Sequence, residues 1–256
     1  MIINAPSDIA FSVFNFPIYW YGIILAVSIL VGFYVADYLS QFRPVKSSLI
    51  LDNAVWFIIV GLLGARVYYC LLNFSYYALH PLQVFDLRQG GLSIHGMLIA
   101  GFLFVFFLCK KNKLKILPLL DVIAASVPLS QAIGRWGNYF NSEAFGIPTY
   151  SNWGLFVLIA KRPENFIDYS LFHPTFLYES VLNFLIFILL SFLIKKSKTN
   201  GVVFSLYLIL YSIARIIVEQ IRIDSALNLF GFPIAQIISL ILILFGLLFM
   251  IKKFDF

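Results

Sequence analysis

The sequence predicts an all-α integral membrane protein, a multi-pass bundle of seven helices. Of its 256 residues, 61% are hydrophobic and only 12% are charged, whereas soluble domains average about a quarter charged residues. Apolar runs of roughly 17–25 residues, the length that crosses a bilayer core, recur from end to end. Backbone groups in lipid must be paired within a segment, and the alternation of a closed barrel is absent. The runs are therefore expected to be helices.

The seven segments are expected in one transmembrane domain without an internal repeat. They fall at residues 19–39, 49–72, 92–109, 116–133, 176–194, 202–217 and 229–251. Two longer connections, residues 73–91 and 135–175, lie on the same side of the predicted membrane. Connections of that length tend to be functional or to carry structure of their own. We expect them to form a small external cap.

The positions of the basic residues predict the orientation of the chain. Eleven of the 18 Lys and Arg follow segments one, three, five and seven: Arg43, Lys46, Lys110, Lys111, Lys113, Lys115, Lys195, Lys196, Lys198, Lys252 and Lys253. By the positive-inside rule this side is cytoplasmic, which places the N-terminus outside and the C-terminus inside. The net charge of +6 is then mostly topological, and it gives no reason to expect a nucleic-acid partner.

The other seven cations lie away from that side or inside a segment. They are Arg66, Arg88, Arg135, Lys161, Arg162, Arg215 and Arg222. Intramembrane ionisable groups are costly and are functional candidates by default. Arg66, Asp121, Gln131 and Glu179 are expected to face the bundle interior and to pair with one another or with a site.

The sixth segment carries a ladder of polar residues. Tyr207, Tyr211, Arg215, Glu219 and Arg222 are spaced four, four, four and three residues apart, which puts all five on one helical face. The ladder could simply neutralise itself. Alternatively, one glutamate cannot cancel two arginines, and the surplus positive charge would then bind an anion.

A second polar cluster, Gly134–Glu143 or GRWGNYFNSE, follows the fourth segment. Its glycines allow backbone to approach a ligand closely, and Arg135 offers a planar fork suited to phosphate or carboxylate. Asn138 and Asn141 add uncharged hydrogen-bonding groups, and Glu143 can orient an arginine. The cluster is either a self-satisfied structural element or part of an anion site.

Histidine and cysteine give weaker signals. His95 lies in GGLSIHG at the outer start of the third segment, and a histidine there could take or give a proton or serve only structure. His80 and His173 each precede a proline and are expected at turns or segment entries. Three scattered histidines lack zinc-ligand spacing. Cys70 and Cys109 lie in different apolar runs and are expected to be packing residues.

GRWGNYFNSE followed by Ala144–Gly146 closely resembles the signature of the prolipoprotein diacylglyceryl transferase family. Other stretches match the family's pattern in the same order: Tyr21-Gly22, Gly64–Arg66, GGLSIHG, His173–Glu179 and Arg215–Glu219. The resemblance covers nearly the whole chain. It departs at Thr175-Phe176, where the family often has serine and glutamine, which affects one local hydrogen bond.

The resemblance implies a bacterial inner-membrane transferase with its site towards the periplasm and with no metal or organic cofactor. Its substrates would be phosphatidylglycerol and the cysteine thiol that follows a lipoprotein signal peptide, within the lipobox. The product would be a thioether, with glycerol phosphate released. Because the leaving phosphate gains charge as its carbon–oxygen bond breaks, fixed cations beside it would be the largest catalytic contribution.

The roles implied for single residues follow from the resemblance and from charge. Arg135 would hold the phosphatidylglycerol phosphate, and Arg215 would support the leaving phosphate with Glu219 fixing its orientation. His95 is the candidate base for the thiol, although a positive field could activate the thiol instead. The supporting residues would be Tyr21, Asn138, Glu143 and Arg222, with Gly146 permitting a tight turn.

Two other functions fit a polar membrane bundle. The first is an anionic-lipid transporter or flippase, but such folds usually show paired halves and broken helices near the midplane. Here the cations gather on the outer side and neither half repeats the other. The second is a scaffold or receptor whose polar core is purely structural.

Overall fold

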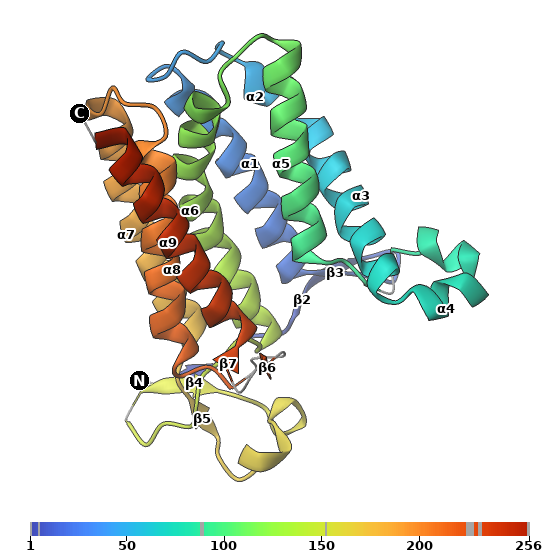
Figure 1. The fold of residues 1–256 in the computed structure, drawn as a ribbon. Coiled ribbons are helices and arrows are strands. Elements are labelled where there is room, and N and C mark those ends of the chain that lie inside the picture. The colour runs from blue at the N-terminus through green and yellow to red at the C-terminus, as the bar shows by residue number, and fades with distance from the viewer. Residues whose placement is uncertain are drawn as a thin grey trace.

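The computed structural model is a bundle of long helices with a small β-containing cap at one end (Figure 1). It describes residues 2–4, 6–87, 90–151, 153–223, 228–229 and 232–254. Arg88 and the side chains of Lys252 and Lys253 lie outside the described part. Seven of the described helices are long and apolar enough to cross a membrane, which confirms the predicted fold class.

The spanning helices occupy these residues: α1 Trp20–Ser40, α3 Ala54–Leu72, α5 Ile94–Lys111, α6 Ile116–Asn141, α7 Thr175–Lys196, α8 Val202–Glu219 and α9 Ile234–Phe254. Five short helices complete the described set: α2 Leu49–Asp52, α4 Phe74–Leu79, η1 Pro81–Phe85, and η2 Ile159–Lys161 and η3 Glu164–Phe166 in the cap. The expected segment 49–72 is therefore two helices. Asn53 separates them, and its side-chain amide donates to the Leu49 carbonyl at 2.8 Å.

Helix α6 continues eight residues beyond the expected end at residue 133. The outer loop therefore begins at Ser142 rather than at Arg135, and most of GRWGNYFNSE is helical. The helix stops where Ser142 adopts a left-handed backbone conformation, with φ 49° and ψ 51°. Sequence reasoning ended the segment where polar residues began, whereas in the structure those residues occupy one side of the last two turns.

Helix α6 is the most extensively buried of the seven spans. It packs against α1 on one side and against α7 and α8 on the other, and α9 covers α8 (Figure 1). Helices α3 and α5 pair with each other beside α1. Apolar side chains such as Leu119, Val122 and Leu190 fill the main core around α6.

A buried ion pair joins the helices at the end opposite the cap. The Arg43 guanidinium donates from Nε to Asp121 at 3.0 Å and from Nη1 to the carbonyls of Ile194 and Ser197. Asp121 also accepts from the backbone N–H groups of Gly201 and Phe204, which caps the start of α8. Arg43, counted by sequence among the topological cations, therefore lies in the interior and fixes α7 and α8 against α6.

The cap combines the long outer connection with the N-terminal residues. Strands β1 (Ile2–Asn4), β4 (Gly154–Phe156) and β5 (Leu171–Phe172) form a sheet in the order β1-β4-β5. The first pair is parallel, with Ile3 opposite Leu155, and the second is antiparallel. Leu155, Phe172 and Phe176 pack in a separate small core that joins the cap to α7. The contribution of β1 was not expected from sequence.

Two hairpins and an arm complete the same end of the molecule. Strands β2 (Ile9–Val13) and β3 (Phe16–Tyr19) pair antiparallel and lead into α1, while β6 (Asn228–Leu229) and β7 (Phe232–Pro233) precede α9. The arm contains α4 and η1. Arg66, buried at the end of α3, fixes it by donating to five backbone carbonyls between Gln83 and Gly91.

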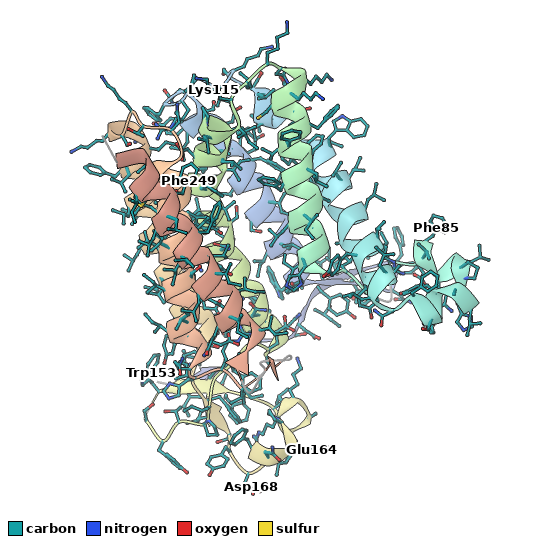
Figure 2. All side chains as sticks on the ribbon, viewed as in Figure 1. Phe85, Lys115, Trp153, Glu164, Asp168 and Phe249 are labelled. Carbon is teal, nitrogen blue, oxygen red and sulfur yellow. The ribbon has the colours of Figure 1, made fainter. Side chains whose placement is uncertain are left out.

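Lysines at the ends of two spanning helices lie at the end opposite the cap. Lys110 and Lys111 lie in the last turn of α5, and Lys195 and Lys196 in the last turn of α7. Figure 2 shows Lys115 at this end and Glu164 and Asp168 at the far end, in the cap.

Candidate active site

Polar side chains of three helices meet at the cap end of the bundle. Arg135 comes from α6, Glu179 from the second turn of α7, and Arg215 and Glu219 from α8. Arg222 follows directly after α8. We call these five residues the arginine cluster. The arginine cluster thus includes the last three residues of the ladder predicted on the sixth segment.

Glu179 is the central carboxylate of the arginine cluster. Its Oε2 lies 2.6 Å from Nη2 of Arg135, and its Oε1 lies 3.4 Å from Arg215 and 3.0 Å from Arg222. Arg215 also pairs with Glu219 at 2.7 Å. Both carboxylates are buried, with side-chain exposures of 5% for Glu179 and 1% for Glu219. One acid therefore holds guanidinium groups from two helices and from the segment after α8.

The cluster carries three cations and two anions, so it has one net positive charge. Burying an uncompensated charge is expensive, which means that the surplus must be solvated or must meet an anion. The three guanidinium groups do reach the surface, with side-chain exposures of 22% for Arg135, 18% for Arg215 and 11% for Arg222. They therefore remain accessible to a ligand.

Arg135 has the largest spare capacity for a ligand. Within the described part of the chain its polar contact is the single ion pair with Glu179, although a guanidinium group offers five N–H donors in a planar fork. Arg215 is engaged by two carboxylates. Arg135 is thus positioned by Glu179 on one edge and keeps other N–H groups for an anion.

The aromatic residues of GRWGNYFNSE hold this part of α6 in place. The rings of Trp136 and Tyr139 contact Phe176 of α7, with centroids 5.7 Å and 5.2 Å away. Phe140 stacks on Trp20 of α1 at 5.0 Å. Aromatic packing against α1 and α7 therefore fixes the turns of α6 that carry Arg135 and Asn138.

Gly137 lets α1 approach α6 closely. A Cβ atom at that position would lie 2.9 Å from Cδ2 of Tyr21, so that ring rests directly on the glycine. Tyr21 is exposed beside α6. The contact places it against the side of α6 that faces α1.

Glu143 contacts asparagines rather than an arginine. Its Oε1 accepts from the amides of Asn138 at 2.9 Å and Asn141 at 3.4 Å. The Asn141 carbonyl accepts from Nζ of Lys161 at 2.8 Å. Among the described contacts, the brace to an arginine expected for Glu143 is not found. The residue instead closes the end of α6 and connects it to the cap.

Gly146 is needed for close packing rather than for a tight turn. Its backbone is extended and bridges Arg222. A Cβ atom here would lie 2.7 Å from the Ile221 carbonyl oxygen and 3.0 Å from side-chain atoms of His173 and Thr175. The N–H of the next residue, Ile147, donates to that same carbonyl at 2.8 Å. Gly146 thereby fixes the segment that carries Arg222.

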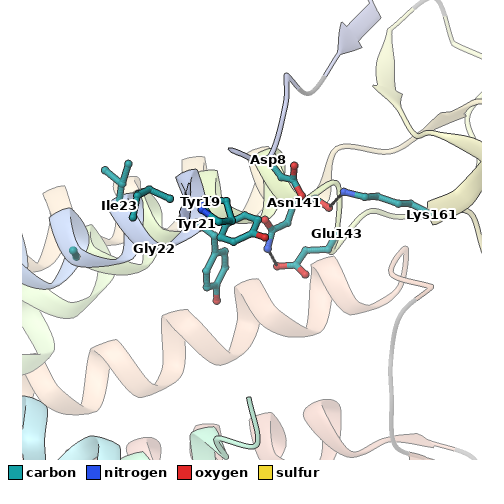
Figure 3. A pocket seen from close by; sticks show the side chains of 11 residues that line it. Asp8, Tyr19, Tyr21, Gly22, Ile23, Asn141, Glu143 and Lys161 are labelled. Carbon is teal, nitrogen blue, oxygen red and sulfur yellow. Dashed lines mark hydrogen bonds between the residues drawn. The ribbon is translucent and has the colours of Figure 1, made fainter. Parts of the chain in front are cut away.

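A cavity of about 870 Å³ lies between the start of α1 and the end of α6. Its walls include Tyr21, Gly22, Ile23 and Ala26 of α1, and Asn141, Glu143 and Lys161 across from them. Figure 3 shows these polar residues together with Asp8 at one end and Ile23 towards the other. The supporting residues Tyr21 and Glu143 therefore face a space large enough for a substrate group.

Comparison with known proteins identifies the family of this chain. The model of the prolipoprotein diacylglyceryl transferase family matches residues 8–252. A Synechocystis sp. protein named phosphatidylglycerol–prolipoprotein diacylglyceryl transferase is 41% identical over 250 residues, or 95% of this chain and 88% of its own length. A Finegoldia magna protein of that name is 40% identical, covering 95% and 94%.

The chain belongs to the prolipoprotein diacylglyceryl transferase family. A further relative with the same name, from Fervidobacterium nodosum, is 40% identical over 241 residues, or 93% of this chain and 82% of its own length. The resemblance recognised in the sequence is thus confirmed. Membership also makes this chain a transferase.

His95 contacts a neighbouring aromatic residue and, among the described contacts, none of the residues of the arginine cluster. It is exposed in the first turn of α5, and its ring contact is with Tyr68, 6.2 Å between centroids. In the described part of the chain it makes no hydrogen bond or ion pair with the cluster. His173 has a local role instead, since its Nδ1 lies 3.1 Å from the Tyr178 hydroxyl.

Sequence reasoning did not identify Glu179 as a central site residue. It was noted only as a polar intrusion that pairs with something. One signal was present: Glu179 is the sole acid within the 22 residues of α7. A buried acid needs cations, and Arg135, Arg215 and Arg222 were available on the same side.

Proposed function

We propose that this transferase moves the diacylglyceryl group of phosphatidylglycerol to the cysteine thiol of a prolipoprotein, the first step of lipoprotein maturation. The observation that carries the proposal is the arginine cluster, whose guanidinium groups are accessible and in which Arg135 keeps N–H donors beyond its ion pair with Glu179. Family membership supplies the reaction class, because the matched relatives are named for it.

Arg135 is proposed to hold the lipid phosphate. Its ion pair with Glu179 orients the guanidinium group, and the remaining N–H donors fit two phosphate oxygens. The neighbouring face of α6 offers Asn138, and α1 offers Tyr21, for hydrogen bonds to the glycerol headgroup. Arg215 is proposed to stabilise the leaving phosphate, with Glu219 fixing its orientation and Arg222 adding to the positive field.

The reaction balances without a further reactant. The cysteine sulfur forms a bond to the terminal glyceryl carbon of the diacylglycerol unit as the bond from that carbon to the phosphate oxygen breaks. The electron pair leaves with the oxygen as glycerol phosphate, and the thiol proton passes to a base. Cations placed where that charge develops lower the barrier, with one such donor worth about 10²–10³ in rate.

His95 is the proposed proton acceptor. Helix α5 runs from His95 to the lysines at the opposite end, so the histidine lies at the same end of the bundle as the arginine cluster. An exposed imidazole could take the proton from a thiol arriving at this end. Electrostatic activation by the arginines is the alternative.

The proposed location is the inner membrane of a bacterium, with the cap and the arginine cluster towards the periplasm. The lysines at the ends of α5 and α7 support this orientation by the positive-inside rule. Phosphatidylglycerol in the outer leaflet of that membrane would have its phosphate at the level of the cluster, with its tails among the helices.

The test is transfer by the purified protein. Incubation with phosphatidylglycerol and a lipobox peptide should add the mass of a diacylglyceryl group to the peptide cysteine in mass spectra. A cysteine-to-serine peptide is the control. Lipid flux in liposomes without any thioether product would instead favour the flippase function.

A further inference from the structure

A second cavity adjoins the one beside Tyr21. It measures about 590 Å³, and its lining includes Asp8 and Lys161, which also line the first cavity. Its wall also includes Ile2, Asn4, Ser142 and Leu158. We call the two cavities together the α1–cap groove. It leads from the outer half of α1 to the cap sheet.

Both halves of the α1–cap groove are mainly apolar and carry a few charged residues. The α1 half presents aliphatic side chains such as Ile23 and Ala26. The cap half is formed in part by the face of β1 that carries Ile2 and Asn4, whereas Ile3 packs in the cap core on the other face. The groove is therefore a mainly apolar channel with Asp8 and Lys161 where its two halves meet.

The charges of the groove do not suit an anionic headgroup. Asp8 and Glu143 contribute two negative charges and Lys161 one positive charge, which is the opposite balance to that of the arginine cluster. The Lys161 ammonium group uses one N–H on the Asn141 carbonyl and has two more. Mixed charges of this kind match a polypeptide, whose backbone offers donors and acceptors without net charge.

The groove is connected to the proposed reaction centre through the end of α6. Glu143 accepts a hydrogen bond from Asn138, which lies one helical turn after Arg135 on α6. A thiol held between Tyr21 and Glu143 would therefore approach the lipid phosphate from the side of α1. The two substrates would occupy neighbouring sites that differ in the sign of their charge.

We propose that the α1–cap groove binds the acceptor polypeptide. Apolar residues before the cysteine lie against α1, the cysteine lies near Tyr21 and Glu143, and the residues after it follow Asp8 and Lys161 onto the cap. This inference rests on the proposed function, because it identifies the binding site of one of its two substrates.

The first test is photocrosslinking. Benzoylphenylalanine is placed at Ala26, which lines the groove, and at Leu25, its exposed neighbour that does not. A radiolabelled lipobox peptide should crosslink to the Ala26 variant at least fivefold more than to the Leu25 variant. Equal crosslinking, or crosslinking of labelled phosphatidylglycerol rather than peptide at Ala26, would overturn the inference.

The second test is kinetic. Asp8→Lys should raise the KM for the peptide about tenfold and leave the KM for phosphatidylglycerol unchanged, because rim charges act mainly on encounter and register. Glu164→Lys makes the same charge change on an exposed cap residue outside the groove and should change neither KM. A rise in the lipid KM alone would assign the groove to lipid.

The two proposals fail differently. If the wild-type protein makes the thioether but the peptide crosslinks elsewhere, only the groove inference is wrong. If the wild-type protein makes no thioether, the proposed function is wrong whatever the crosslinks show.

Discussion

Replacing Arg135 with lysine separates positioning from charge. The lysine ammonium group can still meet Glu179, which lies 2.6 Å from the arginine nitrogen, so the buried carboxylate keeps its three cations. The planar fork is lost, however. Lysine has three N–H donors on one atom, and the contact with Glu179 occupies one of them, whereas arginine keeps donors on two further nitrogens.

The expected loss in kcat/KM is about 10²–10³-fold, or about 2.7–4 kcal/mol, as for removal of one donor to a developing charge. Stability should change little, since the ion pair is kept. The expected shift in Tm is below about 2 °C, which corresponds to about 1 kcal/mol in a protein of this size. Peptide lipidation by mass spectrometry and thermal melting in detergent measure the two quantities. Activity of Arg135→Lys within threefold of wild type would refute the bidentate role of Arg135.

Four further changes test other parts of the structure. Glu179→Gln removes the carboxylate shared by three guanidinium groups. It should abolish transfer and lower the free energy of unfolding by up to about 3 kcal/mol, measured by thermal melting. Full activity of this variant would show that the cluster needs no central acid. Gly146→Ala should lower the free energy of unfolding by about 1–3 kcal/mol and slow transfer, because its Cβ would meet the Ile221 carbonyl oxygen. Gly134→Ala is the control: its Cβ would lie 3.9 Å from the nearest atom, so the change should be neutral or stabilising. Asp121→Asn should lower the free energy of unfolding by about 3–5 kcal/mol, because the buried Arg43 loses its carboxylate partner. Equal melting temperatures of the variant and the wild type would contradict the role of this ion pair in stability. His95→Gln should slow transfer at neutral pH and recover as the pH rises towards the thiol pKa near 8.5, whereas an unchanged rate would remove the base assignment.

The membrane fold was predictable because it depends on short-range features of the chain. Apolar runs of bilayer length and lysines at alternate ends fix the number of spans without tertiary information. The end of α6 was not predictable in this way. Arg135 and Asn138 look like loop residues by hydropathy, but their neighbours Trp136 and Tyr139 pack on Phe176 and extend the helix.

The cations of the site were predictable and their arrangement was not. Arg135, Arg215 and Arg222 were conspicuous as charges in an apolar chain, but Arg222, predicted on the same helical face as Arg215, lies after the end of α8 in a segment that bridges Gly146. The position of Glu179 between them depends on the packing of α7 against both α6 and α8. Likewise, Gly146 could be recognised as special, but only the nearby Ile221 carbonyl oxygen shows that close approach is the reason.

The central claim is that accessible guanidinium groups capture an anionic lipid headgroup. Native mass spectrometry of the purified protein tests it directly, with phosphatidylglycerol and phosphatidylcholine of identical acyl chains offered at equal concentration. The wild-type protein should retain phosphatidylglycerol preferentially, and Arg135→Gln combined with Arg215→Gln should abolish that preference while the protein stays folded. An undiminished preference in the double variant would contradict the account.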